Sequence, residues 1–371
     1  MNIQNLFSLL EKERNSKNTL GNSTPVVYDL SKNKDVGKVK SLLQKKLVWK
    51  IVDDTDEQKR EFYFVQNPKA LNSVNRGNKK FKKLPINSGR WVYYPWSGSL
   101  VHILEPNDYK SLRTSRNKFL ITEKEQKRYE KSEIAFAGLN VGNPAAVSIA
   151  LEGGEAMRFA DNDVLSVSNL NRFRSGIQDL GINKAMLTAR QVYEINPFVE
   201  INVFASGINS GNIQKFILNP KVDIIVEEMD HLPLKLEIRK FAKRHRVPVV
   251  MVTGNGENVI LDIERYDRNP KMAMLNNKLS KNVQDRIVDG EHIQSVQEFA
   301  GLCRDFIGKK YLTKRLNASF EQIGESLAAI PQLAEASFLR GAVLSNVVRR
   351  IILGENIKSG RYIIKMDQLG L

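Results

Sequence analysis

Residues 161–172 (D-N-D-V-L-S-V-S-N-L-N-R) combine an acidic side chain with the polar and basic side chains that bind nucleotides. They lie about one strand–helix–strand step after a glycine-containing turn at 138–142. A glycine turn followed by an acidic residue suggests a bound ribose. Asn169 and Arg172, which follow Asp161 by 8 and 11 residues, suggest that phosphates are bound as well. These spacings together predict ATP used for chemistry rather than a passively bound dinucleotide.

Two further side chains fit this interpretation. Lys184 opens a predicted helix, where a cation opposes the helix dipole, and contact with an ATP phosphate explains it. Asp230 follows a predicted strand, and a carboxylate at a strand's carboxyl end suits Mg²⁺. Three of the features named so far have simpler alternatives. Lys184 can be a solvated lysine, Asp161 can cap a turn, and the glycine turn can be a loop without a ligand.

The order and spacing of these motifs resemble the ThiF-type family, which includes the ubiquitin-activating enzymes and the molybdopterin-synthase and thiamine-pathway adenylyltransferases. The resemblance runs from about Arg113 to the C-terminus. The segment R-W-V-Y-Y-P-W at 90–96 is most similar to a subgroup whose larger members are fused to a nitroreductase-like domain. The residues that carry the resemblance are 134–142 (I-A-F-A-G-L-N-V-G), Asp161, 168–172 (S-N-L-N-R), Lys184 and Asp230.

The resemblance implies an ATP-dependent adenylyltransferase. A substrate carboxylate attacks the α-phosphorus of ATP, giving an acyl-adenylate and pyrophosphate. The carboxylate belongs to a ubiquitin-like or carrier protein or to a small acid. Charge on the phosphates is neutralised by Arg172, Lys184, Arg116 and by Mg²⁺ at Asp230. The remaining nucleotide-binding residues are Gly138, Asn140, Gly142, Asp161, Ser168 and Asn169.

The resemblance also implies a homodimer and raises the question of what Cys303 does. Arg116 lies in the segment 113–117 (R-T-S-R-N), which resembles an arginine segment that in the family reaches the ATP of the partner subunit. Arg116 takes this role only in a homodimer. Cys303 is either a thioester nucleophile or, in our preferred interpretation, a buried structural cysteine.

The glycine turn departs from the family pattern, because it is about one residue shorter and Asn140 and Asn143 stand where glycines are expected. Two alternatives therefore stay open. An NAD-dependent oxidoreductase would explain Gly138, Gly142 and Asp161 but not the later motifs. A non-catalytic nucleotide-binding partner protein would explain the shortened turn.

Apolar and polar patterns predict an α/β fold with a Rossmann-like, mostly parallel sheet and helices on both faces. Strands are expected at 134–137, 156–160, 200–205, 223–226 and 247–252, alternating with helices at 143–151, 183–195, 210–218 and 232–245. A strand at 258–264, a partly helical insertion at 266–328, a helix at 338–353 and a strand at 361–366 extend it. We assign 111–371 to the adenylation domain and 1–110 to a small α+β module, with a helical pattern at 42–47, a strand at 61–65 and a loop at 72–83.

Composition and charge limit the partners, the cysteine chemistry and the cellular location that we expect. The net charge is +16, and residues 1–130 hold 26 Lys+Arg against 14 Asp+Glu. Such a basic part can bind nucleic acid or an acidic protein, but our preferred interpretation is a solvated lysine-rich surface. The single cysteine excludes an internal disulfide and a four-cysteine zinc site, and it fits a reducing cytoplasm. Without a run of about eighteen apolar residues, or a secretory signal in residues 1–11, we expect a cytoplasmic protein without a membrane partner.

Overall fold

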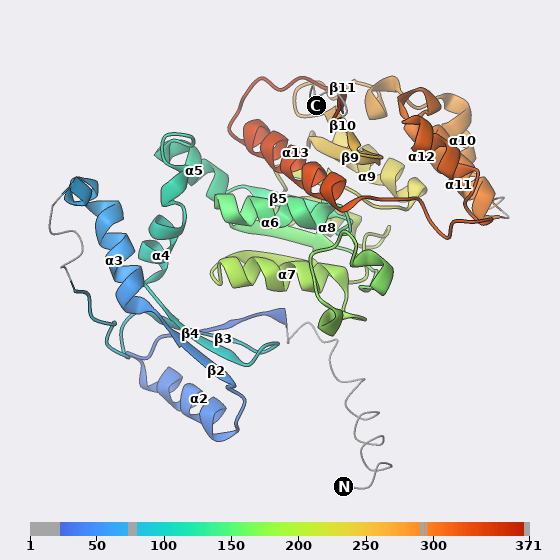
Figure 1. Ribbon diagram of the computed structural model, residues 1–371. Helices are drawn as coiled ribbons and strands as arrows, with labels where there is room; N and C mark the ends of the chain where they lie inside the picture. The colour runs from blue at the N-terminus through green and yellow to red at the C-terminus, as the bar shows by residue number, and fades with distance from the viewer. Residues whose placement is uncertain (1–22, 73–79, 290–292, 294, 367–371) are drawn as a thin grey trace, which may run out of the picture. The chain divides into compact units, whose positions relative to one another are not determined.

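The computed structural model describes residues 23–72, 80–289, 293 and 295–366, and it contains two compact units (Figure 1). The first takes its described residues from 1–126, 151–153 and 189–199, and the second from 127–150, 154–188 and 200–371. Residues 1–11, where we predict no secretory signal, and 73–79 of the predicted loop lie outside the described residues.

The elements of the first unit are, in chain order, β1 (Val26–Tyr28), α2 (Asn33–Gln44), β2 (Lys50–Asp53), α3 (Thr55–Gln66), β3 (Arg90–Tyr94), β4 (Ser99–Ile103), α4 (Pro106–Arg113) and the start of α5 (Glu123–Glu130). Its sheet has the strand order β1-β3-β4-β2, with β2 parallel to β4 and the other pairs antiparallel. Aromatic residues of β3 pack on both faces of this sheet: Trp91 and Tyr93 belong to one buried cluster and Tyr94 to another. The segment at 90–96 is therefore largely a core strand.

Two local predictions for this unit are wrong. Residues 61–65 (E-F-Y-F-V) lie inside α3 rather than in a strand, and the helix predicted at 42–47 is the end of α2, which stops at Gln44. Aromatic and branched residues favour strands only weakly, and packing overrides that preference. In α3, Asp56 and Glu57 in the first turn favour a helix through its dipole, and the Tyr63 ring packs 5.6 Å from that of Phe81.

The second unit is built on a seven-stranded sheet, whose strands are β5 (Glu133–Ala137), β6 (Ala156–Ala160), β7 (Glu200–Phe204), β8 (Ile224–Glu227), β9 (Val249–Asn255), β10 (Asn258–Glu264) and β11 (Gly360–Ile364). The strand order is β11-β10-β9-β8-β5-β6-β7. The five strands from β9 to β7 in that order are parallel, and β10 and β11 add an antiparallel edge. The predicted α/β class, the parallel sheet and its C-terminal strand extension are confirmed.

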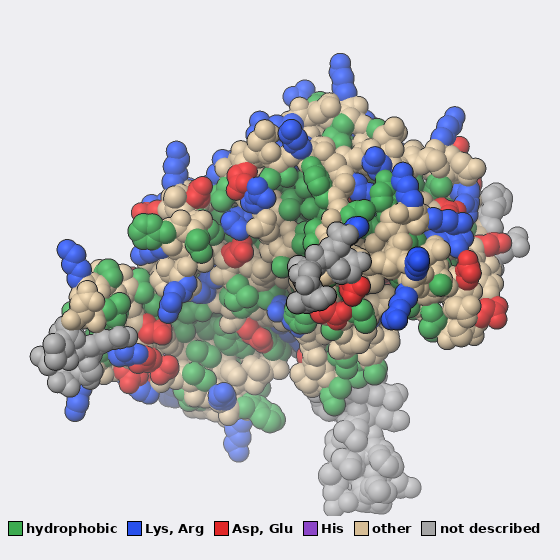
Figure 2. Space-filling view, turned by 45° about the horizontal axis from the view of Figure 1, so that its top comes forward, with side chains coloured by type: hydrophobic (Ala, Val, Ile, Leu, Met, Phe, Trp, Pro, Cys, Tyr) green, Lys and Arg blue, Asp and Glu red, His purple; other side chains and the backbone are tan. Residues whose placement is uncertain are grey.

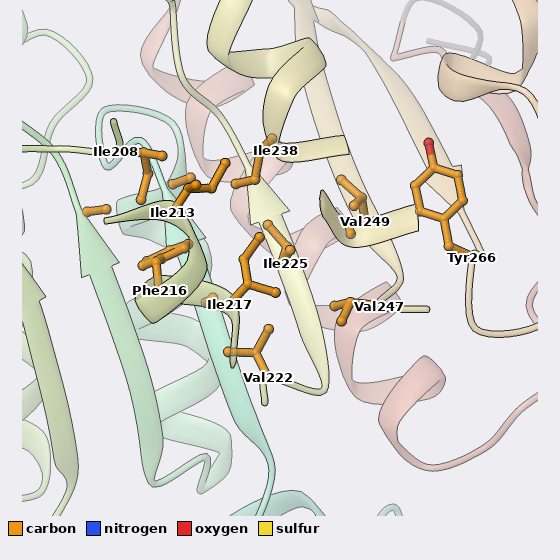
Figure 3. Close-up of a cluster of buried hydrophobic side chains, with 14 residues drawn as sticks. Ile208, Ile213, Phe216, Ile217, Val222, Ile225, Ile238, Val247, Val249 and Tyr266 are labelled. Atoms are coloured by element: carbon orange, nitrogen blue, oxygen red, sulfur yellow. The ribbon is translucent and has the colours of Figure 1, made fainter. Parts of the chain in front are cut away.

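The helices associated with this sheet are α6 (Gly142–Glu152), α7 (Lys184–Ile195), α8 (Ile213–Leu218), α9 (Leu232–Arg244), α10 (Lys281–Val288), α11 (Val296–Ile307), α12 (Lys314–Phe320) and α13 (Ala334–Ile352). α8 and α9 cover one face, where Phe216 and Ile238 pack with Ala135 and Ile225 of the strands (Figure 3). Side chains alternate along a strand, so Phe136 points to the other face, where α6 lies. α13 packs closely on α6 (Figure 1). Helices therefore cover both faces, as predicted.

Four buried charges connect α9 to the carboxyl ends of β8 and β10. Lys235 donates to Glu227 at 3.0 Å, and Arg239 bonds to Glu227 and, at 2.7 Å, to Glu264. Burial acts to raise the pKa of Glu227, but Lys235 and Arg239 outweigh it and hold that pKa below its usual value. The two acids and two cations thus compensate each other inside the protein.

Gly138 lets the chain turn between β5 and α6 beside the end of β8. Its φ of +91° is in the left-handed region, and a Cβ atom there would lie 2.4 Å from the carbonyl oxygen of Glu228. Gly142 is different, because a Cβ would meet only the Phe136 ring, at 3.6 Å. The fold therefore requires glycine at the first position and not at the second.

Surface charge is mixed. On the face drawn in Figure 2, Lys and Arg side chains stand among Asp and Glu side chains rather than in one continuous patch. Among the residues that the structure describes, no helix is both long and apolar enough to cross a bilayer.

We expect Gly138→Ala to lower the free energy of unfolding by about 2 kcal/mol or more, because the new Cβ meets a peptide group and the backbone is strained. Gly142→Ala is the matched control and should be neutral or slightly stabilising, since it lies in a helix. Urea unfolding followed by circular dichroism measures both. Equal stability of the two variants would contradict the assignment.

Arg239→Met should lower the free energy of unfolding by about 3–5 kcal/mol, because buried Glu264 loses its ion pair with Arg239 and buried Glu227 keeps only the one with Lys235. Lys240→Met, at the neighbouring exposed position, is the control and should change stability little. The same unfolding measurement applies, and a similar small effect of both substitutions would show that the network does not stabilise the fold.

Candidate functional site

A cleft of about 1030 Å³ opens at the carboxyl ends of β5, β6 and β8. Gly138 and Asn140 line it after β5, Asp161 lines it after β6, and Glu228 and Asp230 line it after β8. Side chains of α10 and α11 form the opposite wall. Ligands of parallel α/β sheets bind in such a crevice outside the carboxyl ends of the strands.

Asp161 joins two of these loops. One oxygen of its carboxylate accepts a hydrogen bond from the backbone N–H of Leu139 at 2.6 Å, and the other accepts one from Asp163 at 2.8 Å. Burial raises the pKa of Asp161, and the two hydrogen bonds oppose this effect. The ribose role predicted for Asp161 stays a prediction, and it would use the lone pairs that the backbone leaves free.

Lys184 is placed by the same loop. Its ammonium lies 3.0 Å from the carboxylate of Asp163, which lines the cleft, while Lys184 itself is buried.

Sequence reasoning missed the preceding residue, Asn183. The Asn183 amide donates to the carbonyls of Asp161, Asp163 and Ala205, and its oxygen accepts from the first backbone N–H groups of α7. An asparagine directly before a helix is the available signal, because asparagine favours that position.

Some side chains of the loop at 168–172 form hydrogen bonds within the loop, and others are exposed to solvent. The Asn169 side chain accepts from the backbone N–H of Ser166 at 3.2 Å, and the hydroxyls of Ser166 and Ser168 lie 3.1 Å apart. Arg172 donates to the Ser168 carbonyl at 3.0 Å, but its buried Nε has no hydrogen-bond partner in the described part of the chain. Burial lowers the pKa of Arg172, and the charge of Asp230 opposes this shift.

The two acids after β8 have different surroundings. Glu228 is buried and accepts from the backbone N–H of Val252 at 2.7 Å. Burial raises its pKa to about 8, despite the opposing charge of Lys235. Asp230 is exposed, and within the described residues its carboxylate takes part in no hydrogen bond or ion pair. It is therefore available to a ligand.

No three His, Cys, Asp or Glu side chains converge to hold a metal ion among the described residues. A Mg²⁺ ion here would take one carboxylate, that of Asp230, with its other ligands from phosphate and water, which is a common arrangement for this ion. The donor set fits that description.

Four further candidate residues have different surroundings. Arg116 belongs to the first unit, on the 3-10 helix Ser115–Asn117, and is exposed. Gly142 is the first residue of α6, and the buried side-chain oxygen of Asn140 has no partner in the described part of the chain. Cys303 on α11 is half-buried, and burial, helped by the charge of Asp230, raises its pKa to about 12. A thiol with this pKa is protonated at neutral pH and is a poor nucleophile.

The model of the ThiF family matches residues 114–272. The uncharacterized protein MT1398 of Mycobacterium tuberculosis is 33% identical over 275 residues, which cover 73% of this chain and 37% of that protein. A probable molybdopterin-synthase adenylyltransferase of Porphyra purpurea is 31% identical over 108 residues, covering 29% of this chain and 28% of the relative. The chain thus spans well under half the length of these relatives.

Among solved structures, Escherichia coli MccB with ATP is similar at 18% identity and a TM-score of 0.48, covering 66% of this chain and 64% of that one. The family match covers the glycine turn after β5, the cleft residues after β6 and β8, and Arg172 and Lys184. Residues 114–272 thus match the ThiF family.

Proposed function

We propose that the second unit binds ATP in the cleft and transfers its adenylyl group to a substrate carboxylate. One observation carries the proposal: the charge of Asp230, which lines the cleft, interacts with the half-buried guanidinium of Arg172, whose Nε has no hydrogen-bond partner among the described residues. A cation and a metal-binding acid beside a cleft suit a polyphosphate. The family match and the relative named as an adenylyltransferase support the same chemistry.

The proposed roles follow from position. Asp161 binds the ribose, and Gly138, Asn140 and Gly142 bring backbone N–H groups at the start of α6 toward the phosphates. Arg172 and Lys184 compensate charge on the phosphate oxygens, and Ser168 and Asn169 hold the loop that presents Arg172. Asp230 would hold Mg²⁺, which supplies further charge compensation when bound. No general base is required, because a carboxylate is already ionised at neutral pH.

We also propose a homodimer in which Arg116 of the partner subunit completes each site. Two apolar side chains close to Arg116 in the sequence are almost fully in solvent: Phe119 is 101% exposed and Leu120 is 85% exposed. Exposed large apolar residues beside a functional cation suit a protein interface. The lone, protonated thiol of Cys303 is compatible with the cytoplasmic location that we propose.

Arg172→Ala and Asp230→Ala should each lower ATP–pyrophosphate exchange by roughly 10²–10³-fold, the usual effect of removing one preorganised charge partner. Cys303→Ala should retain exchange, since its thiol takes no part in adenylation. Circular dichroism confirms folding of each variant. Loss of exchange in Cys303→Ala with retention in Arg172→Ala would contradict the roles, and NAD-dependent turnover in place of exchange would contradict the function.

Mixing Arg116→Ala with Asp230→Ala protein tests the shared site. Each variant alone should be inactive, whereas a statistical mixture should recover about one quarter of wild-type exchange, because half of the dimers carry one intact site. Light scattering reports the oligomeric state. A monomer at micromolar concentration, or no recovery after subunits are shown to exchange, would remove the role of the partner's Arg116.

A further inference from the structure

A second, smaller cavity adjoins the cleft. Its volume is about 140 Å³, and Asn140, Glu228 and Asp230 line both spaces. The two cavities therefore meet at the loop after β5 and the end of β8.

Apolar side chains form much of the wall of the small cavity. Phe306 of α11, Leu316 and Phe320 of α12, and Pro331 and Leu333 ahead of α13 line it. A dry apolar cavity of ~150 Å³ accepts a benzene ring. The small cavity therefore has room for one compact apolar group, and it is too small for an extended peptide.

A buried cation lines the same space. The side chain of Arg340 on α13 is 4% exposed. Its Nε donates to the Ala336 carbonyl and its Nη2 to the side-chain oxygen of Gln332, both at 3.2 Å. Within the described residues it forms no ion pair, and Nη1 donates no hydrogen bond. A guanidinium has five donors, so Arg340 retains several for a ligand.

The acids near Arg340 do not pair with it. The carboxylate of Glu228 accepts a hydrogen bond from the backbone N–H of Val252, and among the described residues it forms no ion pair with Arg340. Asp230 is exposed and is the residue that we assign to Mg²⁺. An anion held by a buried, incompletely bonded arginine is the complementary ligand.

We propose that the small cavity is an acyl pocket: it holds the apolar body of a small monocarboxylic acid, and Arg340 holds the carboxylate where the pocket meets the cleft. The inference rests on the proposed function and specifies its substrate class. One carboxylate oxygen forms a bond to the α-phosphorus of ATP. The bond from that phosphorus to the bridging oxygen breaks, and pyrophosphate leaves with the electron pair.

Binding of 4-fluorobenzoate without ATP, followed by ¹⁹F NMR, tests the pocket alone. The wild-type chain should bind it, and Arg340→Gln should weaken binding by about tenfold or more, as expected for a lost charge-assisted hydrogen bond. Ala336→Leu, which fills the cavity from α13, should weaken binding similarly while leaving Arg340 in place. Arg350→Gln, on the same helix, is the matched control and should bind normally. Absence of binding to the folded wild-type chain, or equal binding by all variants, overturns the pocket.

ATP–pyrophosphate exchange separates the pocket from the proposed function. Benzoate and isovalerate should stimulate exchange, whereas succinate and a peptide ending in Gly-Gly should not. Exchange that responds only to succinate or the peptide overturns the acyl pocket and leaves adenylation standing. Arg340-dependent binding of 4-fluorobenzoate without exchange for any acid overturns adenylation and leaves the pocket standing.

Discussion

The cleft depends on the compensation of charge beneath it. Glu227 ends β8 and Glu264 ends β10, and both are buried against Lys235 and Arg239 of one helix. An unpaired charge in this position would be costly, so the helix and the two strand ends keep a fixed arrangement. Asp230 follows Glu227 by three residues, so the exposed carboxylate in the cleft lies close in sequence to the strand end that this network holds.

The loops above this network are tied to one another by backbone contacts. Gly138 passes against the peptide of Glu228, and Asp161 accepts from the backbone of the loop after β5 as well as from its own. The groups proposed to bind a nucleotide thus also hold the cleft in shape. Because these loops are already held in place, fewer side chains would have to become ordered when a ligand binds.

The sequence predicts the sheet well because strands and helices alternate with clear apolar patterns, and β6 and β10 agree with their predicted limits. The strand predicted at 61–65 is wrong, because packing outweighs the weak preference of aromatic and branched residues for strands, and these residues lie in α3. The candidate residues after β5, β6 and β8 meet at one cleft because parallel strands end at the same edge. The hydrogen bond from Leu139 to Asp161 joins residues 22 apart in the sequence, and the burial of Arg340 depends on tertiary packing, so no spacing rule reveals either.

Asn183 lies where the loops after β6 and β7 meet the start of α7, and its hydrogen bonds restrict which side chain can stand there. Its amide nitrogen lies 2.8–3.3 Å from three carbonyl oxygens, while its oxygen faces two N–H groups. Aspartate has nearly the same shape, yet it would set a second oxygen, without a hydrogen, against those carbonyls. At this position a change of one atom, from nitrogen to oxygen, would turn attraction into repulsion between β6, β7 and α7. The three carbonyls and two N–H groups around this one side chain therefore fix its polarity as well as its shape.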